Sequence, residues 1–347
     1  MLKLRTIFVF FLVGLLLISG CAASPHSETS KNEILESSET AQFHFIDVGQ
    51  GDCTLIYSDD TVILIDAGTY ESGSNTCNYI KNLGIDTIDY FIGSHPHEDH
   101  IGGAAAVLTL FDVENVFMNG EFTTSYAFEK MVDVMLRKNI TPVIPEINKS
   151  YDAGPFKLKF ISPENDYKDT NNNSLVLSIT YKDIKALFTG DCERMVESYL
   201  VNSDKKLSAD ILKVAHHGSR DSSSSDFLEK VSPTVAVIQC GKDNSYGHPH
   251  KETLERLSRT NAQIFRTDES GTIILRTDGI KIYNTSGEEQ NKSQQVEKET
   301  DYIGNINSRV FHRKTCKNLP SEKNRIGFAT IEEAIENNYK ACGNCNP

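Results

Sequence analysis

The fold of this chain is decided by the stretch His95-Pro96-His97-Glu98-Asp99-His100-Ile101-Gly102-Gly103, in which three histidines and one aspartate fall within six positions. The apolar run at residues 88–92 predicts a buried strand before it, and residues 104–110 predict a helix directly after it. We therefore expect these side chains on a strand-to-helix turn, where a rigid scaffold can direct several of them at one point. Imidazole and carboxylate groups suit zinc, manganese or iron, so the spacing favours a metal site over a solvated histidine-rich turn.

Composition narrows the class of protein. The chain has 347 residues, 39% hydrophobic and 24% charged, enough for one large domain and a small one. Apolar runs alternate with amphipathic stretches between residues 42 and 284, which predicts a layered α/β domain. The formal charge of −13 argues against a broad basic surface for nucleic acid, although bound metal would supply positive charge locally.

Individual elements follow from periodicity and turn residues. The strands expected are residues 43–48, 53–57, 61–65, 88–92, 156–161, 175–181, 185–189, 211–215, 235–239, 273–276 and 280–283. The helices expected are residues 74–83, 104–110, 126–137, 225–230 and 250–259.

Four further segments place histidines or carboxylates at the predicted ends of strands. They are Leu64–Gly68, with Asp66; Phe188–Asp191; Val214–Ser219, with His216 and His217; and Tyr246–His250, with His248. Each segment alone would fit a turn or a buried, hydrogen-bonded histidine. Their common position at strand ends indicates that they converge on one site.

The H-x-H-x-D-H spacing resembles the metal signature of the metallo-β-lactamase superfamily. A closer resemblance, over residues 42–284, is to the extracellular hydrolase domain of the ComEC family of competence DNA-uptake proteins. It is carried by Ile46–Asp52, the stretch at 95–103, Asn172–Leu177, Thr189–Asp191, His216–Ser219 and Tyr246–His250. The resemblance implies an αββα sandwich. Most superfamily members have a histidine about twenty residues before the bridging aspartate, where this chain has Asn171–Ser174, a departure shared with the ComEC-like group.

The resemblance also implies two divalent metal ions, zinc or manganese, and the residues that hold them. The first ion would take His95, His97, Asp191 and a fourth ligand such as His216; the second would take Asp99, His100, Asp191 and His248. Whether His216 or His217 is a ligand stays open. Asp66, Asp47 and Asp52 are expected to orient the ligands from behind.

Two ions about 3.5–4 Å apart can activate water and stabilise an in-line displacement at a phosphodiester. Asp99 is the expected acceptor of the water's proton, and His217 would donate to a phosphate oxygen unless it is a hydrogen-bonding residue behind the ligands. Resemblance makes DNA or nucleotides the favoured substrate. The alternatives are an esterase that cleaves phosphodiesters of the cell envelope, such as phosphorylcholine esters, and a non-catalytic DNA-binding or uptake-assisting protein.

The C-terminal part predicts a separate zinc module. Residues 285–300 are polar and free of aromatic side chains, which predicts a linker before a module at 301–347. His312, Cys316, Cys342 and Cys345 fit a closed tetrahedral zinc site, and the module resembles the zinc-binding domain of the Ada DNA-repair protein. Because His312 stands where Ada-type domains have the methyl-accepting cysteine, the methyl-transfer function is not expected here. Seven basic against five acidic residues leave both DNA contact and a purely structural role open.

The first residues predict a targeting segment. Lys3 and Arg5 precede a 12-residue apolar run, and Ile18-Ser19-Gly20-Cys21 resembles a bacterial lipobox. Residues 1–20 are expected to be a lipoprotein signal peptide and residues 21–41 a flexible tether. Cys21 would then carry a lipid that anchors the protein to the cell membrane on its extracytoplasmic face, with no transmembrane channel in the chain. A plain signal peptide is the alternative.

Four other cysteines, Cys53, Cys77, Cys192 and Cys240, are expected to be buried thiols, although an extracytoplasmic location would also permit disulfides. The sequence leaves the oligomeric state open.

Overall fold

The computed structural model describes residues 40–203, 205–286, 301–328 and 330–347. The expected signal peptide, its lipidated cysteine, nearly all of the tether and most of the linker lie outside the described residues. Within the described part of the chain, no helix has the length and apolar character needed to cross a membrane.

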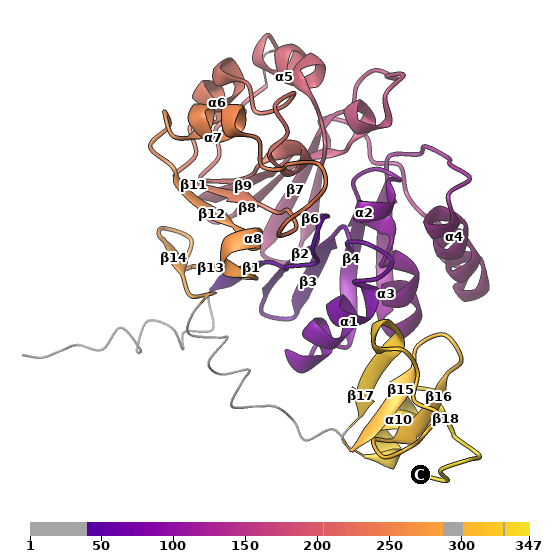
Figure 1. The fold of residues 1–347 in the computed structure, drawn as a ribbon. Coiled ribbons are helices and arrows are strands. Elements are labelled where there is room, and N and C mark those ends of the chain that lie inside the picture. Colours follow the sequence, from indigo (N-terminus) through magenta and orange to yellow (C-terminus); the bar gives the residue numbers. More distant parts are fainter. Residues whose placement is uncertain (1–39, 204, 287–300, 329) are drawn as a thin grey trace, which may run out of the picture. The chain divides into compact units, whose positions relative to one another are not determined.

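Two seven-stranded sheets form the large domain (Figure 1). The first has the order β14 (Ile282–Asn284), β13 (Ile273–Thr277), β1 (Ala41–Phe45), β2 (Thr54–Ser58), β3 (Thr61–Ile65), β4 (Thr87–Gly93) and β5 (Asp112–Met118). The second has the order β12 (Gln263–Arg266), β11 (Val235–Ile238), β10 (Ile211–Lys213), β9 (Ile184–Phe188), β8 (Val176–Tyr181), β7 (Phe156–Ser162) and β6 (Ser150–Ala153).

Three apolar cores create the layers. The middle core lies between the sheets and contains Phe43 and Ile63 from the first sheet and Phe160 and Ile179 from the second. Because side chains alternate along a strand, Leu64 faces the opposite core while its neighbours on β3 face the middle one. That outer core packs under α1 (Gly73–Asn82), α3 (Ala104–Leu110) and α4 (Tyr126–Lys138), and the third packs under α5 (Arg194–Val201), α6 (Ser225–Val231) and α7 (Lys251–Leu257). The predicted αββα sandwich is therefore confirmed.

Most predicted elements are present within one or two residues of the expected bounds, and residues 61–65 and 104–110 match them. In the large domain, the strands β5, β6 and β12 and the helices α2 (Glu98–Ile101), α5 and α8 (Thr267–Ser270) were not predicted. The first half of β5 alternates exposed and half-buried residues, and β6 is a short edge strand, so both lack a continuous apolar run. The strand expected at 211–215 is wrong at its end, because His216 and His217 adopt positive φ angles of 51° and 53° in a 3₁₀ turn, η2 (Ala215–Gly218).

The C-terminal module is a four-stranded sheet with the order β17 (Arg325–Phe328), β15 (Tyr302–Asn305), β16 (Val310–Arg313) and β18 (Lys340–Ala341), with helix α10 (Ile331–Glu336). It belongs to the same compact unit as the large domain. Ser74 Oγ donates a hydrogen bond to the Lys323 carbonyl at 2.5 Å, and Arg309 donates to the Thr109 carbonyl at 2.9 Å. Phe311 of the module lies in the same apolar core as α1 and α3.

Gly102 and Gly103 let the start of α3 lie directly against the turn that follows β3. A methyl group on Gly102 would overlap the backbone nitrogen of Tyr70, and one on Gly103 would overlap the carbonyl of Ala67. The two glycines therefore allow the end of the histidine-rich stretch to lie against the loop that follows β3.

We predict that Gly102→Ala lowers the free energy of unfolding by about 2 kcal/mol through overpacking, although helix propensity alone would predict a gain of up to about 1 kcal/mol. Urea denaturation followed by circular dichroism measures the change. Gly93→Ala is the control, since its added methyl would lie 3.5 Å from Ile101 Cγ2, an ordinary van der Waals distance. Unchanged or increased stability of Gly102→Ala would show that this contact does not constrain the turn.

Candidate metal centre

The predicted site residues lie at the carboxyl ends of strands from both sheets. β3 and β4 run parallel in the first sheet, and β9, β10 and β11 run parallel in the second. The loops that follow these strands carry Asp66, the stretch at 95–100, Asp191 and the His216–His217 pair. Ligand sites commonly form at such ends, where several loops meet over a rigid sheet.

One group of ligand atoms lies within 4.8 Å of one another and comprises Asp99, His100, Asp191 and His217. Nε2 of His100 lies 3.2 Å from Asp191 Oδ2, and Nε2 of His217 lies 3.5 Å from the same oxygen. His217 Nε2 also lies 3.2 Å from Asp99 Oδ2. Two imidazoles and two carboxylates therefore face one small volume.

A second set of atoms lies somewhat farther from the same Asp191 oxygen. His95 Nε2 lies 3.0 Å from His97 Nδ1 and 4.0 Å from Asp191 Oδ2. His216 Nε2 lies 3.8 Å from that oxygen. The buried oxygen Asp191 Oδ1 has no hydrogen-bond partner. A carboxylate shared between two sets of histidines, with an unpaired buried oxygen, fits a bridging ligand of two cations.

Hydrogen bonds behind the rings fix which nitrogens point inward. His217 Nδ1 donates to the Gln239 carbonyl at 3.0 Å, which leaves Nε2 to face the carboxylates. His100 Nδ1 lies 2.8 Å from Asp66 Oδ2, and Asp66 also accepts hydrogen bonds from the amide and hydroxyl of Ser94. Such outer partners orient metal-binding histidines and set their tautomers.

Ser174, the last residue of the Asn171–Ser174 segment, contacts two candidate ligands. Its Oγ lies 3.3 Å from His95 Nδ1 and accepts a hydrogen bond from the Asp191 amide at 3.0 Å. The serine thus supports two candidate ligands from behind.

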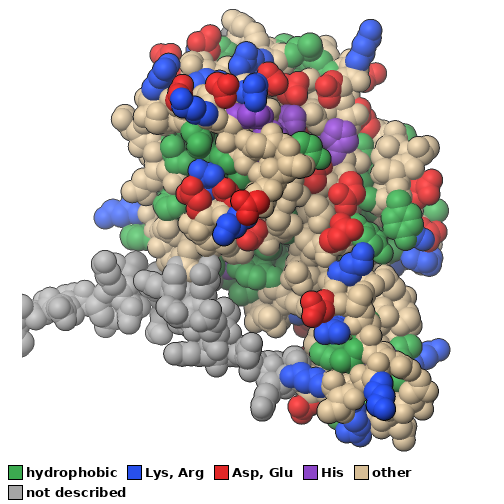
Figure 2. Space-filling view, viewed as in Figure 1, with side chains coloured by type: hydrophobic (Ala, Val, Ile, Leu, Met, Phe, Trp, Pro, Cys, Tyr) green, Lys and Arg blue, Asp and Glu red, His purple; other side chains and the backbone are tan. Residues whose placement is uncertain are grey.

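His248 and Asp47 lie outside the close group. The ring centroid of His248 is 5.6 Å from that of His216 and 6.1 Å from that of His217, and the ring stacks on Tyr246. Burial, together with His217 and His216, lowers the pKa of His248 to about 4. Asp47 is exposed and accepts a hydrogen bond from the Gly49 amide, so it stabilises a turn and does not contact the histidines. Figure 2 shows histidine side chains reaching the surface in a row bordered by charged groups of both signs.

Electrostatics of the site favour cations. Burial by itself lowers the pKa of a histidine, but the Asp191 and Asp66 carboxylates outweigh it and hold the pKa of His100 well above its usual value. Burial would lower the pKa of His217 as well, but the carboxylates of Asp191 and Asp52 outweigh burial and raise that pKa. At His95, burial and the neighbouring His100 lower the pKa.

Lys213 contacts the candidate site and was missed by the sequence analysis. Its side chain is 2% exposed, and its ammonium forms an ion pair with Asp52, whose other oxygen lies 3.2 Å from His217 Nδ1. Burial alone would raise the pKa of Asp52, but Lys213 and His217 reverse that effect and lower it. A lysine inside the apolar strand β10 was the available signal, since a charged group is rarely buried without a partner.

The carboxylates of the site outnumber its fixed cation. The site holds four carboxylates, those of Asp52, Asp66, Asp99 and Asp191, and Lys213 pairs with one of them, Asp52, so three negative charges remain when the histidines are neutral, as metal-bound histidines are. Such an excess in a buried site is costly unless cations bind there. The donor set therefore fits a pair of divalent metal ions.

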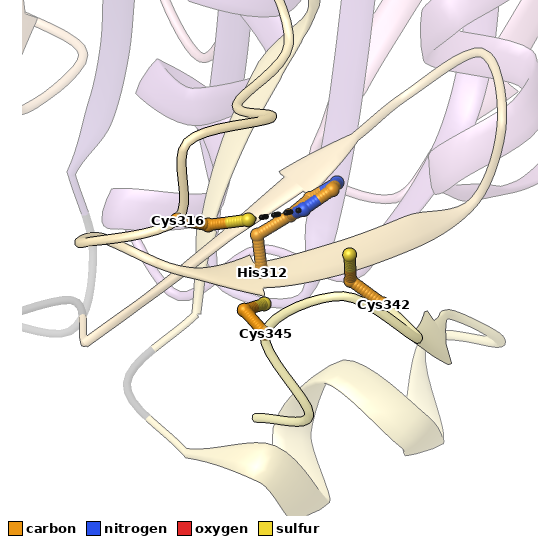
Figure 3. A group of neighbouring side chains, drawn as sticks. All are labelled: His312, Cys316, Cys342 and Cys345. Atoms are coloured by element: carbon orange, nitrogen blue, oxygen red, sulfur yellow. Dashed lines mark hydrogen bonds between the residues drawn. The ribbon is translucent and has the colours of Figure 1, made fainter.

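The predicted zinc ligands of the module also converge. His312, Cys316, Cys342 and Cys345 offer ligand atoms within 4.8 Å of one another (Figure 3). His312 Nδ1 lies 3.4 Å from Cys316 Sγ. The backbone amides of Cys345 and Asn344 lower the pKa of Cys342, which favours the thiolate that binds metal. The remaining four cysteines of the described chain, Cys53, Cys77, Cys192 and Cys240, are buried thiols.

This fold and this ligand arrangement define a metallo-hydrolase scaffold, and comparison with known proteins identifies the family. Residues 46–242 match the metallo-beta-lactamase superfamily, and residues 290–347 match the metal binding domain of Ada. The chain belongs to the metallo-beta-lactamase superfamily and carries an Ada-type metal-binding domain at its C-terminal side.

Homologues include competence proteins. The chain is 30% identical over 260 residues to ComE operon protein 3 of Bacillus subtilis, covering 69% of this chain and 33% of that protein. It is 30% identical over 230 residues to Competence protein ComA of Neisseria gonorrhoeae, covering 65% of this chain and 31% of that protein. The chain thus spans about a third of the length of these relatives.

Among solved structures, the metallo-beta-lactamase fold protein YhfI from Bacillus subtilis is similar with 13% identity and a TM-score of 0.47, covering 69% of this chain and all of that one.

We predict that Lys213→Met lowers the free energy of unfolding by about 3–5 kcal/mol, because it leaves the buried carboxylate of Asp52 without its partner. Adding Asp52→Asn should recover part of the loss, since the uncompensated charge is then gone. Thermal and urea unfolding of both variants measure the coupling, with the exposed Lys157→Met as control. If the double variant loses more free energy of unfolding than the sum of the two single losses, a direct ion pair between Lys213 and Asp52 is contradicted.

Proposed function

We propose that this protein is a metal-dependent phosphodiesterase whose substrate is DNA or nucleotides. The charge of the site carries the proposal. Its three excess negative charges would become one net positive charge with two divalent ions, which complements the single negative charge of a phosphodiester. Oxygen and nitrogen donors without thiols suit zinc or manganese and a hard phosphoryl oxygen.

The geometry supports one distribution of ligands. His95 Nε2, His97 Nδ1, His216 Nε2 and Asp191 would hold the first ion. Asp99, His100 Nε2, His217 Nε2 and Asp191 would hold the second. His217 thereby takes the role expected of His248, and both histidines of the pair become ligands.

When bound, two such ions would polarise the phosphoryl oxygens and activate a water for in-line attack. Asp99 is 28% exposed at its side chain and can accept a proton from water that enters the site. His248, half-buried beside His216 at the entrance, is placed to donate to the substrate. Asp52, Asp66 and Ser174 hold the ring nitrogens in their working orientation.

The resemblance to competence proteins favours DNA over other phosphodiesters. A role in DNA uptake follows from that resemblance and rests on a match to about a third of each relative. An envelope phosphodiester would fit the same charge, so the substrate has to be identified by direct comparison.

Asp191→Ala should reduce hydrolysis of bis-p-nitrophenyl phosphate by at least about 100-fold and lower the bound metal, because one carboxylate serves both ions. Activity and metal content per chain are measured together, with circular dichroism to verify folding. Asp226→Ala, an exposed aspartate on α6, is the matched control. Near-normal turnover by Asp191→Ala would refute the dinuclear assignment.

Cys342→Ser should remove one zinc from the module and leave hydrolysis of bis-p-nitrophenyl phosphate intact.

A substrate panel decides the class of phosphodiester. Single- and double-stranded DNA, a cyclic dinucleotide and p-nitrophenyl phosphorylcholine are compared under the same metal loading. Preference for the DNA or nucleotide substrates supports the proposal. Preference for the phosphorylcholine ester would assign the protein to the cell envelope, and inactivity on every substrate would favour a binding role.

We further propose that Cys21 carries a lipid anchor on the extracytoplasmic face of the membrane. A diacylated cysteine holds a protein on a bilayer more firmly than one acyl chain does. Wild-type protein should therefore sediment with membranes in cell fractionation, and Cys21→Ala should shift it to the soluble fraction or leave it unprocessed. Wild-type protein found wholly in the medium would contradict the anchor.

A further inference from the structure

A groove of about 700 Å³ runs along the outer side of α3. It lies between α3, α4 and the turn that joins β15 to β16 of the module. Gly102, the last but one residue of the histidine-rich stretch, lines it. So does Tyr70, whose amide donates a hydrogen bond to Glu98 Oε1 of that same stretch at 2.6 Å. One end of the groove therefore lies beside the stretch that carries four candidate metal ligands, and the ligands themselves do not line it.

An exposed aromatic side chain, Tyr126, lines the groove, and a second one, Phe122, lies four residues before it in the sequence. Tyr126 is 59% exposed and meets Tyr70 edge-to-face, with ring centroids 5.6 Å apart. Phe122, on the loop before α4, is 90% exposed and touches Phe128 only edge-on. These rings bury little surface in any core, so packing does not explain why aromatic residues are present at these positions.

The groove is basic in a chain that is strongly acidic. Lys130, Arg137, Lys138 and Arg309 line it, against a single acidic residue, Asp133. The chain as a whole carries a net charge of −13. Lys130 Nζ lies 5.2 Å from the centroid of the Tyr126 ring, so a cation and an aromatic face are offered side by side.

We propose that this groove binds single-stranded nucleic acid and guides it to the metal centre. The inference rests on the proposed function and names the form of substrate. Exposed rings beside lysine and arginine match the way proteins hold single strands, with bases stacked on aromatic faces and phosphates next to cations. Paired bases in a duplex are stacked on one another and cannot use the rings in this way. Charge complementarity and the position beside the ligands favour this occupant over an acidic peptide.

The test uses the full chain and a fluorescein-labelled twelve-nucleotide oligothymidylate, with Asp191→Ala present in every binding sample to prevent cleavage. Fluorescence anisotropy measures affinity. Tyr126→Leu and Lys130→Glu should each weaken binding about tenfold. Tyr126→Phe, which keeps the ring, and Lys230→Glu, the same charge change on α6, should stay within about twofold. Lys130→Glu should also reduce the slope of the logarithm of the affinity against the logarithm of the salt concentration by about 1, as expected when one phosphate contact is lost.

The outcomes separate this inference from the proposed function. Hydrolysis of bis-p-nitrophenyl phosphate by Tyr126→Leu, made in the otherwise unchanged chain, should equal that of the wild type, which also verifies folding. If the wild type does not hydrolyse this compound, the proposed function fails. If the wild type is active but Tyr126→Leu and Lys130→Glu bind the oligonucleotide as the controls do, the groove proposal is overturned. Equal or tighter binding of a twelve-base-pair duplex, or no binding of the single strand, overturns it as well.

Discussion

The candidate centre depends on contact between the two sheets, because each sheet carries half of its ligands. The first sheet supplies Asp66 and the stretch at 95–100, and the second supplies Asp191 and His217. Gln239 ties the halves together: its side chain donates hydrogen bonds to the carbonyls of Ile46 and Cys53, while its own carbonyl accepts from His217 Nδ1. A shift between the sheets would therefore move the two imidazole groups relative to each other.

Charge is the second constraint on the site. Carboxylates from both sheets point into a volume that water scarcely reaches, and Lys213 offsets only one of them. A second fixed cation would leave less negative potential for metal ions, and the absence of Lys213 would leave the folded chain with more buried repulsion. The ion pair with Asp52 therefore balances two needs, stability of the metal-free chain and attraction for cations.

The C-terminal module packs against α3 of the large domain. Its Arg309 donates to the backbone of α3, and Phe311 lies in the core beneath that helix. The module's own metal ligands form a closed set of four, so chemistry at that metal is not expected. What the module can contribute to the large domain is a wall, which converts the open face of α3 and α4 into a groove.

The sequence alone predicted the fold class, the family and the local motifs of both ligand clusters. Ligand spacing within one turn is local: His95, His97, Asp99 and His100 have to lie together wherever the chain folds, and a Cys-x₂-Cys pair does the same at Cys342 and Cys345. Alternating apolar runs likewise predicted strands buried on both faces. Short elements such as β5 and α5 were missed because charged and polar residues, such as Glu114 and Asn115 in β5 and Glu197 and Ser198 in α5, interrupt their apolar residues.

The tertiary structure decided which distant side chains meet the local motif. It brings His217 into the close group in place of His248, because positive φ angles at both members of the pair turn His217 inward and a carbonyl after β11 fixes its ring. It places Asp47 in a solvent-facing turn and pairs Lys213 with Asp52. Such pairings depend on how the two sheets pack, and the spacing of residues along the chain does not determine the distances between side chains of different sheets.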